Sequence, residues 1–116
     1  DSTSIAALTN AYNHVQGLKP LTAFERDLSE DPLLPQELNK FDAAIFDPPR
    51  AGAPAQAEQL AASTIKTIVG VSCEPASFAK DAATLVEAGF TLQCVTPIDQ
   101  FKYTAHVELV ALFERK

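Results

Sequence analysis

The sequence predicts an α/β fold with a mostly parallel sheet and one antiparallel strand at or near its edge. Short, nearly continuous apolar runs, which are typical of strands buried on both faces, alternate with segments of helical periodicity. The last two apolar runs have no helical segment between them. A loop joining them allows an antiparallel pair, whereas the earlier strands are separated by helices and are expected to run parallel.

The N-terminal part predicts a helix and a short strand. Residues 4–15 have apolar side chains near helical spacing, and Gly17 follows as a stop; these side chains are Ile5, Leu8, Tyr12 and Val15. We expect residues 21–26 to form a short strand that leads into Asp27. Residues 28–40 contain prolines at two positions, which indicates a loop or one short helical turn.

The middle of the chain predicts strands that are each followed by a helix. The apolar run 41–46 ends at Pro48 and Pro49, which cannot donate ladder hydrogen bonds. The Ala-rich residues 56–63 predict a helix, and residues 67–71 a second buried strand. Residues 77–87 predict a helix that Gly89 caps, with one apolar face made of Phe78, Ala82, Leu85 and Val86.

The last strands are predicted at residues 90–96 and 107–113, with a loop over 97–105. Side chains alternate between the faces of the final strand: His106, Glu108, Val110 and Leu112 share one, and Val107, Leu109, Ala111 and Phe113 share the other. Glu108 is unusual in so apolar a strand, because a carboxylate there needs water or a partner. An edge-strand Glu that faces solvent and discourages aggregation explains it as well as a functional group does.

Length and composition describe one domain at most. The chain has 116 residues, and 47% of them are hydrophobic, which is too many for a disordered protein. A chain of this size can build a core without disulfides or metals. The 9 Lys and Arg residues against 15 Asp and Glu give a net charge of −6. This chain by itself therefore lacks the basic surface typical of a nucleic-acid-binding protein.

Other features exclude further classes of protein. No apolar run approaches the ~18 residues of a membrane span. The start of the chain, Asp1-Ser2-Thr3-Ser4, has no basic region typical of a signal peptide. Cys73 and Cys94 are too few for a zinc or iron–sulfur site and give no disulfide framework. We therefore expect no metal and a reducing, cytoplasmic location.

Three candidate sites follow apolar runs. Ligands of open parallel sheets bind beyond the carboxyl ends of the strands, and this rule selects Asp27, the turn 47–50 and the turn 72–75. Structural explanations are open for each carboxylate. Asp27 fits a helix N-cap or a solvated turn, and Asp47 fits a turn aspartate before a proline.

The two cysteines receive different interpretations. A lone cysteine such as Cys73 is most often a small buried hydrophobe. Its place just past a strand and near the start of a helix raises the other possibility, because helix N-terminal amides favour the thiolate. Cys94 lies within a predicted strand, and we interpret it as a core residue.

Three motifs occur in order along the chain. They are Asp47-Pro48-Pro49-Arg50-Ala51-Gly52, then Val71-Ser72-Cys73-Glu74-Pro75-Ala76, then Phe101 through Thr104-Ala105-His106-Val107-Glu108. Together, in order and spacing, they closely resemble the C-terminal motifs of the RNA 5-methyluridine methyltransferases. The Asp-Pro-Pro turn alone is a weak signal, since amino-methyltransferases carry similar turns. Cysteine in Ser-Cys-X-Pro followed by His-Val-Glu is much more specific.

The resemblance implies an enzyme of the class I methyltransferase fold that uses S-adenosyl-L-methionine to methylate carbon 5 of a uridine in RNA. Carbon 5 of uracil attacks a sulfonium methyl only after a thiolate has added to carbon 6. A base then removes the carbon 5 proton so that the thiolate can leave. By resemblance, Cys73 is the nucleophile and Glu108 the base. Asp47 matches a residue at the cofactor and target-base crevice, and Asp27 one near the adenosine end of the cofactor.

Two positions depart from the family's pattern. Glu74 stands where the family usually has Asn, and a carboxylate beside a nucleophilic thiol opposes its ionisation. The segment Phe101-Lys102-Tyr103-Thr104 stands where Pro-His often follows the Phe. The first departure concerns activation of the thiol, and the second concerns local contacts with the substrate.

The resemblance also implies that residues 1–116 are the C-terminal half of a catalytic domain. The family's Gly-rich cofactor loop has no match here, and Asp1 falls at or just after the end of the family's second strand. The first two strands are therefore expected upstream, with RNA-binding segments that often include a small β-barrel. We expect this fragment to be inactive alone, and its exposed sheet edge favours a dimer.

Two other functions stay open at this point. A non-catalytic α/β interaction module derived from the methyltransferase fold is favoured slightly by Glu74, the acidic charge and the missing Gly-rich loop. An amino-group methyltransferase would use the Asp-Pro-Pro turn, but it leaves Cys73 and Glu108 without roles.

Overall fold

The strands form one mixed sheet in the order β1-β2-β4-β3. The computed structural model describes residues 2–14, 17, 21–23, 25–98 and 108–116. Strands β1 (Ala43–Phe46) and β2 (Thr67–Ser72) pair in parallel, and β4 (Glu108–Glu114) is antiparallel both to β2 and to β3 (Thr91–Ile98). The predicted sheet is confirmed, because β1, β2 and β3 share one direction and the antiparallel β4 lies next to the edge strand β3.

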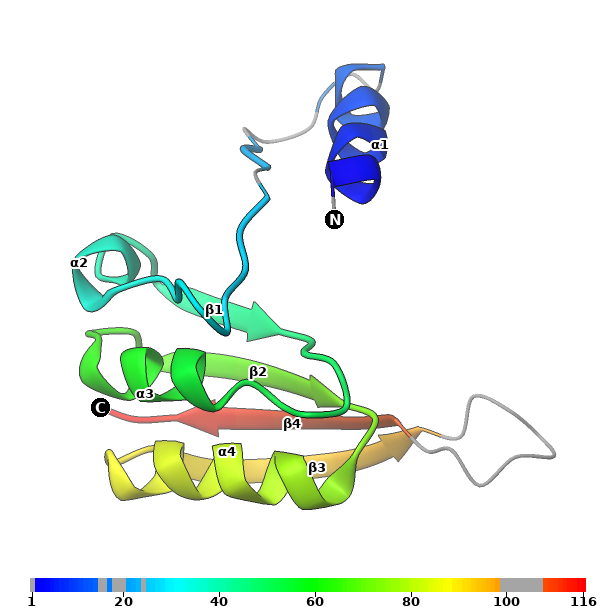
Figure 1. Cartoon of the computed structure of the whole chain (residues 1–116). Coiled ribbons are helices and arrows are strands. Elements are labelled where there is room, and N and C mark those ends of the chain that lie inside the picture. The colour runs from blue at the N-terminus through cyan, green and yellow to red at the C-terminus, as the bar shows by residue number, and fades with distance from the viewer. Residues whose placement is uncertain (1, 15–16, 18–20, 24, 99–107) are drawn as a thin grey trace, which may run out of the picture.

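Three helices lie over one face of this sheet, as Figure 1 shows. They are α2 (Pro35–Leu38), α3 (Pro54–Ala62) and α4 (Pro75–Glu87), and each begins with a proline, whose fixed φ suits the first helical position. Helix α1 (Ser2–Asn13) stands away from the sheet. The predicted helices are confirmed, with bounds shifted by a few residues. Within the described part of the chain, no helix is long and apolar enough to cross a membrane.

The hydrophobic core fills the space between these helices and the sheet. Its fully buried side chains come from β2, β4, α4 and the approach to β2, and they include Ile65, Ile68, Leu85 and Phe113. The Phe78 ring of α4 packs on Phe113 at 6.2 Å between centroids. A Cβ on Gly70 would lie 3.1 Å from the Phe46 ring, so glycine lets β2 pass beneath that ring.

The opposite face of the sheet carries no helix among the described residues, and we call it the open face. Alternation along the strands and the pairing register assign to it the side chains of Ile45, Val69, Val71, Cys94, Val110 and Leu112. Ile45 is 76% exposed, in contrast to the fully buried Ile68 of the neighbouring strand. The sheet is therefore buried on one face and accessible on the other.

Two predictions of burial are wrong. Cys94 is exposed, because it pairs with Leu112 on the open face of the edge strand β3. Val86 is 48% exposed, whereas Phe78, Ala82 and Leu85 of the same helix are buried. Val86 directly follows Leu85, and the 100° step per residue turns its side chain away from the core.

The strand predicted at residues 21–26 is also wrong. Residues 21–23 and 25–27 have no strand structure, since no neighbouring strand pairs with them. The side chain of Arg26 instead turns toward Asp31 and Glu37. The loop with one short helical turn predicted over residues 28–40 is confirmed by α2.

The last hairpin differs in length from the prediction. Strand β3 continues through Pro97, which pairs with Leu109, and ends at Ile98. A proline is tolerated there because β3 lies at the sheet edge, where one side of the strand needs no ladder donor. The rest of the predicted loop and the start of the last strand, residues 99–107, lie outside the described residues.

Arg115, directly after β4, joins the ends of two helices to the sheet. Its guanidinium lies 4.0 Å from the centroid of the Phe90 ring. Its N–H groups donate to main-chain carbonyls at the ends of α3 and α4 and before β2, namely those of Leu60, Ala61, Ser63, Ile65 and Ala88. Carbonyls at a helix end lack partners within the helix, so Arg115 supplies donors to them, although the Leu60 carbonyl also accepts hydrogen bonds from Ser63.

Candidate active site

Cys73 lies in a tight turn between β2 and α4, and its side chain is partly buried. The Ser72 hydroxyl spans this turn: it accepts a hydrogen bond from the Glu74 N–H at 3.1 Å and donates to the Glu74 carbonyl at 3.0 Å. Glu74 is the N-cap of α4, and its carboxylate accepts from the Ala76 N–H at 3.1 Å. Local hydrogen bonds therefore fix the backbone on both sides of Cys73.

Glu108 is the first residue of β4, and the register of the β2–β4 pair, continued by one residue, places it opposite Cys73. The antiparallel ladder ends with the pair Ser72–Leu109, and Cys73 and Glu108 are the next residues of the two chain segments in this register. Leu109 packs against the core, and alternation therefore directs Glu108 to the open face. Its Oε2 atom is buried and has no hydrogen-bond partner among the described residues. Because an unpaired buried carboxylate oxygen is costly, it calls for a functional explanation.

Asp47 follows β1 and is exposed. Because β1 and β2 are parallel, their carboxyl ends meet at one edge of the sheet, and the turns after them are neighbours. Arg50 Nη2 lies 3.6 Å from Glu74 Oε2, and the Ser77 hydroxyl donates to the Arg50 carbonyl at 2.6 Å. The structure thus brings together two of the three predicted sites, the turns 47–50 and 72–75.

The departure from the family pattern at Glu74 has a structural role. Its carboxylate caps α4 and faces the Arg50 guanidinium, which places a positive charge beside it. An N-cap acceptor typically stabilises a helix by about 1 kcal/mol. An asparagine side chain can also accept such a bond, so the capping function is one that both residue types can serve.

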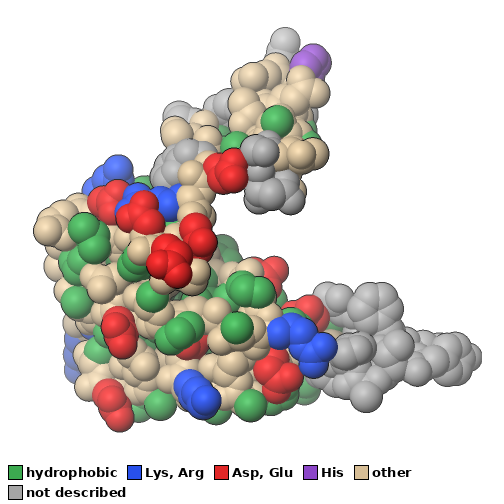
Figure 2. Space-filling view, in the orientation of Figure 1, with side chains coloured by type: hydrophobic (Ala, Val, Ile, Leu, Met, Phe, Trp, Pro, Cys, Tyr) green, Lys and Arg blue, Asp and Glu red, His purple; other side chains and the backbone are tan. Residues whose placement is uncertain are grey.

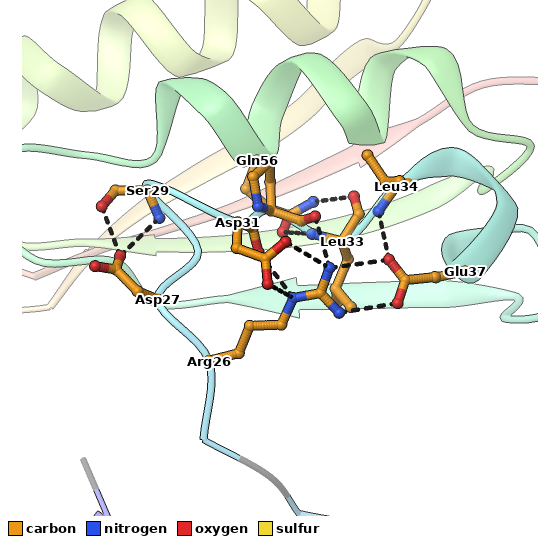
Figure 3. A network of polar contacts seen from close by, with 9 residues as sticks. Arg26, Asp27, Ser29, Asp31, Leu33, Leu34, Glu37 and Gln56 are labelled. Atoms are coloured by element: carbon orange, nitrogen blue, oxygen red, sulfur yellow. Dashed lines mark hydrogen bonds and ion pairs between the residues drawn. The ribbon is translucent and has the colours of Figure 1, made fainter.

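Asp27, the third predicted site, belongs to a separate polar network (Figure 3). Its Oδ1 accepts hydrogen bonds from the Ser29 N–H at 3.0 Å and the Ser29 hydroxyl at 2.6 Å, and the pKa of Asp27 is lowered by them. Asp27 is exposed, which fits the solvated turn and not the helix N-cap. Among the described residues, no hydrogen bond or ion pair joins Asp27 to Asp47 or Cys73.

The centre of this network is Arg26 (Figure 3). Its guanidinium contacts the Glu37 carboxylate at 2.8 Å and the Asp31 carboxylate at 3.2 Å, and it donates to the Pro32 carbonyl at 2.9 Å. The hydrogen bond from Arg26 is the main reason that the pKa of Glu37 is lowered to about 2. The Arg26 side chain therefore holds together the two ends of the loop that follows Asp27, by bonding to residues between Asp31 and Glu37.

Two residues of α4 that the sequence analysis missed also lie next to the site. The Asp81 carboxylate accepts a hydrogen bond from the Ala53 N–H at 2.7 Å, and burial raises the pKa of Asp81. Ser77, one turn earlier, holds the Arg50 carbonyl. In the sequence, Asp81 is an acidic residue between Phe78 and Ala82 on the predicted apolar face. This position could have indicated that its carboxylate has a buried partner.

The residues at the carboxyl ends of β1 and β2 fit only part of the cofactor that the resemblance implies. Its four glycines, at positions 17, 52, 70 and 89, stand singly, so none forms a Gly-rich loop after a strand. The groups at the carboxyl ends of β1 and β2 offer carboxylates and a cysteine. This donor set fits contacts to the polar groups of a nucleoside cofactor. It does not provide the main-chain N–H groups with which a Gly-rich loop would hold such a cofactor.

The fold and the motifs define an α/β protein of the methyltransferase class. In a comparison with solved structures, the chain is similar to the Pyrococcus abyssi tRNA (uracil-54, C5)-methyltransferase in complex with S-adenosyl-L-homocysteine. The TM-score is 0.59 and the sequence identity 39%, over 66% of this chain and 19% of that protein. The sequence pattern of the tRNA (Uracil-5-)-methyltransferase family matches residues 7–116. The chain belongs to this family.

Curated relatives support this assignment. An uncharacterized RNA methyltransferase of Rhizobium meliloti is 50% identical over 99% of this chain. The 23S rRNA (uracil(1939)-C(5))-methyltransferase RlmD of Xanthomonas euvesicatoria pv. vesicatoria is 51% identical over 66% of it. The chain spans 28% of the length of the first relative and 17% of the second. It therefore corresponds to a minor part of these proteins.

Proposed function

We propose that the whole protein methylates carbon 5 of a uridine in RNA through a covalent adduct with Cys73, with S-adenosyl-L-methionine as methyl donor. The observation that carries the proposal is the juxtaposition of Cys73 and Glu108 at the end of the β2–β4 pair, with Glu108 Oε2 buried and unpaired among the described residues. The solved relative that holds S-adenosyl-L-homocysteine supports the choice of cofactor.

The two side chains divide the chemistry between them. The Cys73 thiolate adds to carbon 6 of the uracil ring, and the resulting enolate makes carbon 5 nucleophilic. Bound S-adenosyl-L-methionine supplies the methyl group that carbon 5 takes up. The Glu108 carboxylate then accepts the proton of carbon 5, and the electron pair released re-forms the carbon 5–carbon 6 double bond as the thiolate leaves.

Residues 1–116 act in this proposal as the C-terminal half of a catalytic domain. Asp47 contacts the cofactor and the target base, and Asp27 approaches the adenosine end of the cofactor. The remaining contacts to the cofactor come from the rest of the protein, in line with the 28% of the relatives' length that this chain spans. The proposed location is the cytoplasm.

The RNA-binding surface lies mainly outside this chain in our proposal. The net charge is −6, and Figure 2 shows acidic side chains spread over the helix-covered face without a continuous basic patch on it. RNA affinity depends on the neutralisation of phosphates by Lys and Arg. The chain contributes the chemistry, and basic surface elsewhere in the whole protein contributes the affinity.

The nucleophile is tested with RNA that contains 5-fluorouridine. Fluorine cannot leave as a proton does, so the whole protein is expected to form a covalent adduct that survives denaturing electrophoresis. Cys73→Ala abolishes the adduct, whereas Cys94→Ala, which removes the exposed cysteine of β3, leaves it intact. An adduct that persists in the Cys73→Ala protein contradicts the assignment.

The base is tested with unmodified RNA. Glu108→Gln keeps the size of the side chain but removes its basicity, so it should reduce kcat by about 10²- to 10⁴-fold. The Cys73 adduct of methylated RNA should then accumulate, because its breakdown needs the base. Normal turnover in Glu108→Gln would show that another group takes the proton.

Binding of the cofactor tests the division of the domain. Calorimetry on the chain of residues 1–116 is expected to show little or no binding of S-adenosyl-L-methionine, because the chain has no Gly-rich loop. Micromolar binding would refute the proposal that most of the cofactor pocket lies elsewhere. The whole protein is the positive control.

A second candidate is a non-catalytic interaction module, which the open face with the 76% exposed Ile45 favours. In that case Cys73→Ala and Glu108→Gln leave the function of the whole protein unchanged. The chain alone would then use its sheet edge or open face for association. Sedimentation of residues 1–116 tests the dimer through the edge strand β1, and a monomer at high concentration rules it out.

A further inference from the structure

Helix α4 directs two polar side chains at the loop after β1. Ser77 and Asp81 are four residues apart, so they lie on the same side of the helix. The Ser77 hydroxyl donates to the Arg50 carbonyl at 2.6 Å, and the Asp81 carboxylate accepts from the Ala53 N–H at 2.7 Å. The loop that begins at Asp47 is thus bonded to α4 at two points.

Asp81 is buried to an extent that is rare for an acidic residue. Only 3% of it is exposed, and burial of a carboxylate is costly unless hydrogen bonds compensate. The only hydrogen bond to this carboxylate within the described part of the chain comes from Ala53. The burial of the Asp81 carboxylate is costly, and its hydrogen bond goes to an amide of the loop. This indicates that Asp81 serves to hold the loop in position.

Gly52 shows how closely the loop lies against α4. Its φ is +81°, and a Cβ there would lie 2.9 Å from Asp81 Oδ2 and 3.1 Å from the Ser77 Cβ. Glycine is therefore required both by the backbone conformation and by the space. The Gly52 N–H also donates to the Pro49 carbonyl at 2.9 Å and closes the turn. The loop therefore lies in direct contact with α4 at Gly52.

Helix α4 also begins directly after the turn that holds Cys73. We propose that Asp81 is a positioning residue, which holds the loop 47–53 on α4 and thereby sets the place of Asp47 relative to Cys73. This inference rests on the proposed function, in which Asp47 contacts the cofactor and Cys73 the uracil ring. One helix then fixes both groups: Cys73 through its N-terminal turn, and Asp47 through Asp81.

The kinetic test uses the whole protein with Asp81→Ala, Asp81→Asn and a control, Leu85→Val. Leu85 is fully buried one turn further along α4, so its truncation weakens the same helix. Asp81→Ala is expected to raise KM for S-adenosyl-L-methionine about tenfold or more, since small misplacements of a positioned group are costly. The yield of the Cys73 adduct with 5-fluorouridine RNA should stay near that of the unchanged protein.

The conservative variant separates positioning from stability. The amide oxygen of Asp81→Asn can accept the Ala53 hydrogen bond, so this variant should keep KM within about twofold of the unchanged protein. Leu85→Val should lower the melting temperature without raising KM. An equal rise of KM in Leu85→Val and Asp81→Ala, at equal loss of stability, would overturn the positioning role.

Hydrogen exchange at the Ala53 amide tests the contact itself. The amide is expected to exchange faster in Asp81→Ala, but to stay protected in Asp81→Asn and Leu85→Val. Protection that persists in Asp81→Ala overturns the inference, whatever the kinetics show. If the unchanged protein forms no adduct and methylates no uridine, the proposed function fails. The role of Asp81 in placing Asp47 for catalysis then fails with it. The exchange result still decides independently whether Asp81 holds the loop.

Discussion

The two faces of the sheet differ in what they do. The face under α3 and α4 carries the buried core, with Ile68 and Phe113 fully buried. The open face carries Ile45, which is 76% exposed, and Glu108 stands at its edge. Neighbouring residues of one strand point to opposite faces, so each strand serves both. Burial of the core on one side of the sheet stabilises the fold, and the chemistry that we propose would take place at the rim of the other.

The largest expected effect comes from a matched pair of isoleucines. Ile68→Ala removes a fully buried side chain and should lower the free energy of unfolding by about 2–5 kcal/mol. Ile45→Ala, on the neighbouring strand and the open face, should change it by less than about 0.5 kcal/mol. Urea denaturation of the chain measures both. Equal losses would show that both faces contribute alike to stability.

Arg115 tests how the helix layer is attached to the sheet. Arg115→Ala leaves carbonyls at the ends of α3 and α4 without donors and should cost about 2–3 kcal/mol in unfolding free energy. Arg115→Lys should recover little, since one ammonium cannot replace a planar fork that reaches several carbonyls. The exposed Lys116→Ala is the control. A loss in Arg115→Ala no larger than in this control would contradict the role.

The smallest effects are pH dependences of opposite sign. The folded pKa of Glu37 is lowered from 4.5 to about 2, chiefly by its hydrogen bond with Arg26. Glu37 therefore contributes stability that is present above about pH 4.5 and is lost as the pH falls toward 2. Burial raises the pKa of Asp81 from 3.8, so its contribution to stability decreases as the pH rises through its folded pKa.

Melting temperatures across the acid range measure both effects. Glu37→Gln should flatten the loss of stability on acidification, and Asp81→Asn should remove the opposing trend. The two variants therefore shift the acid limb in opposite directions. A shift in the same direction would show that one of the two carboxylates has a folded environment different from the one described.

Local patterns predicted most of the sheet and its helices. Apolar runs bounded by prolines and glycines predict β1, β2 and α4 correctly. The pattern of each of these elements depends only on residues that are close together in the sequence. The turns at Cys73 and Asp47 followed from the rule that ligands bind at the carboxyl ends of parallel strands. In the structure, contacts of Arg50 with Glu74 and Ser77 join these two turns.

Predictions that depend on distant parts of the chain failed. Residues 21–26 have the composition of a strand, but a strand needs a partner, and no strand pairs with the described residues of this segment, 21–23, 25 and 26. The apolar strand around Cys94 predicts a core position, yet Cys94 is exposed, because exposure depends on which face the helices cover. Asp81 was missed because its partner, the Ala53 amide, is 28 residues away in the sequence.

Strand β4 follows all the other elements in the chain, yet it lies inside the sheet, between β2 and β3. During synthesis, β2 and β3 are therefore made with no strand between them, and their facing edges stay unpaired until residues 108–114 have left the ribosome. Unpaired edges invite pairing with other chains. Pairing of β4 with β2, from Thr67 with Glu114 to Ser72 with Leu109, is therefore a late step, and it covers the edges that β2 and β3 expose until then.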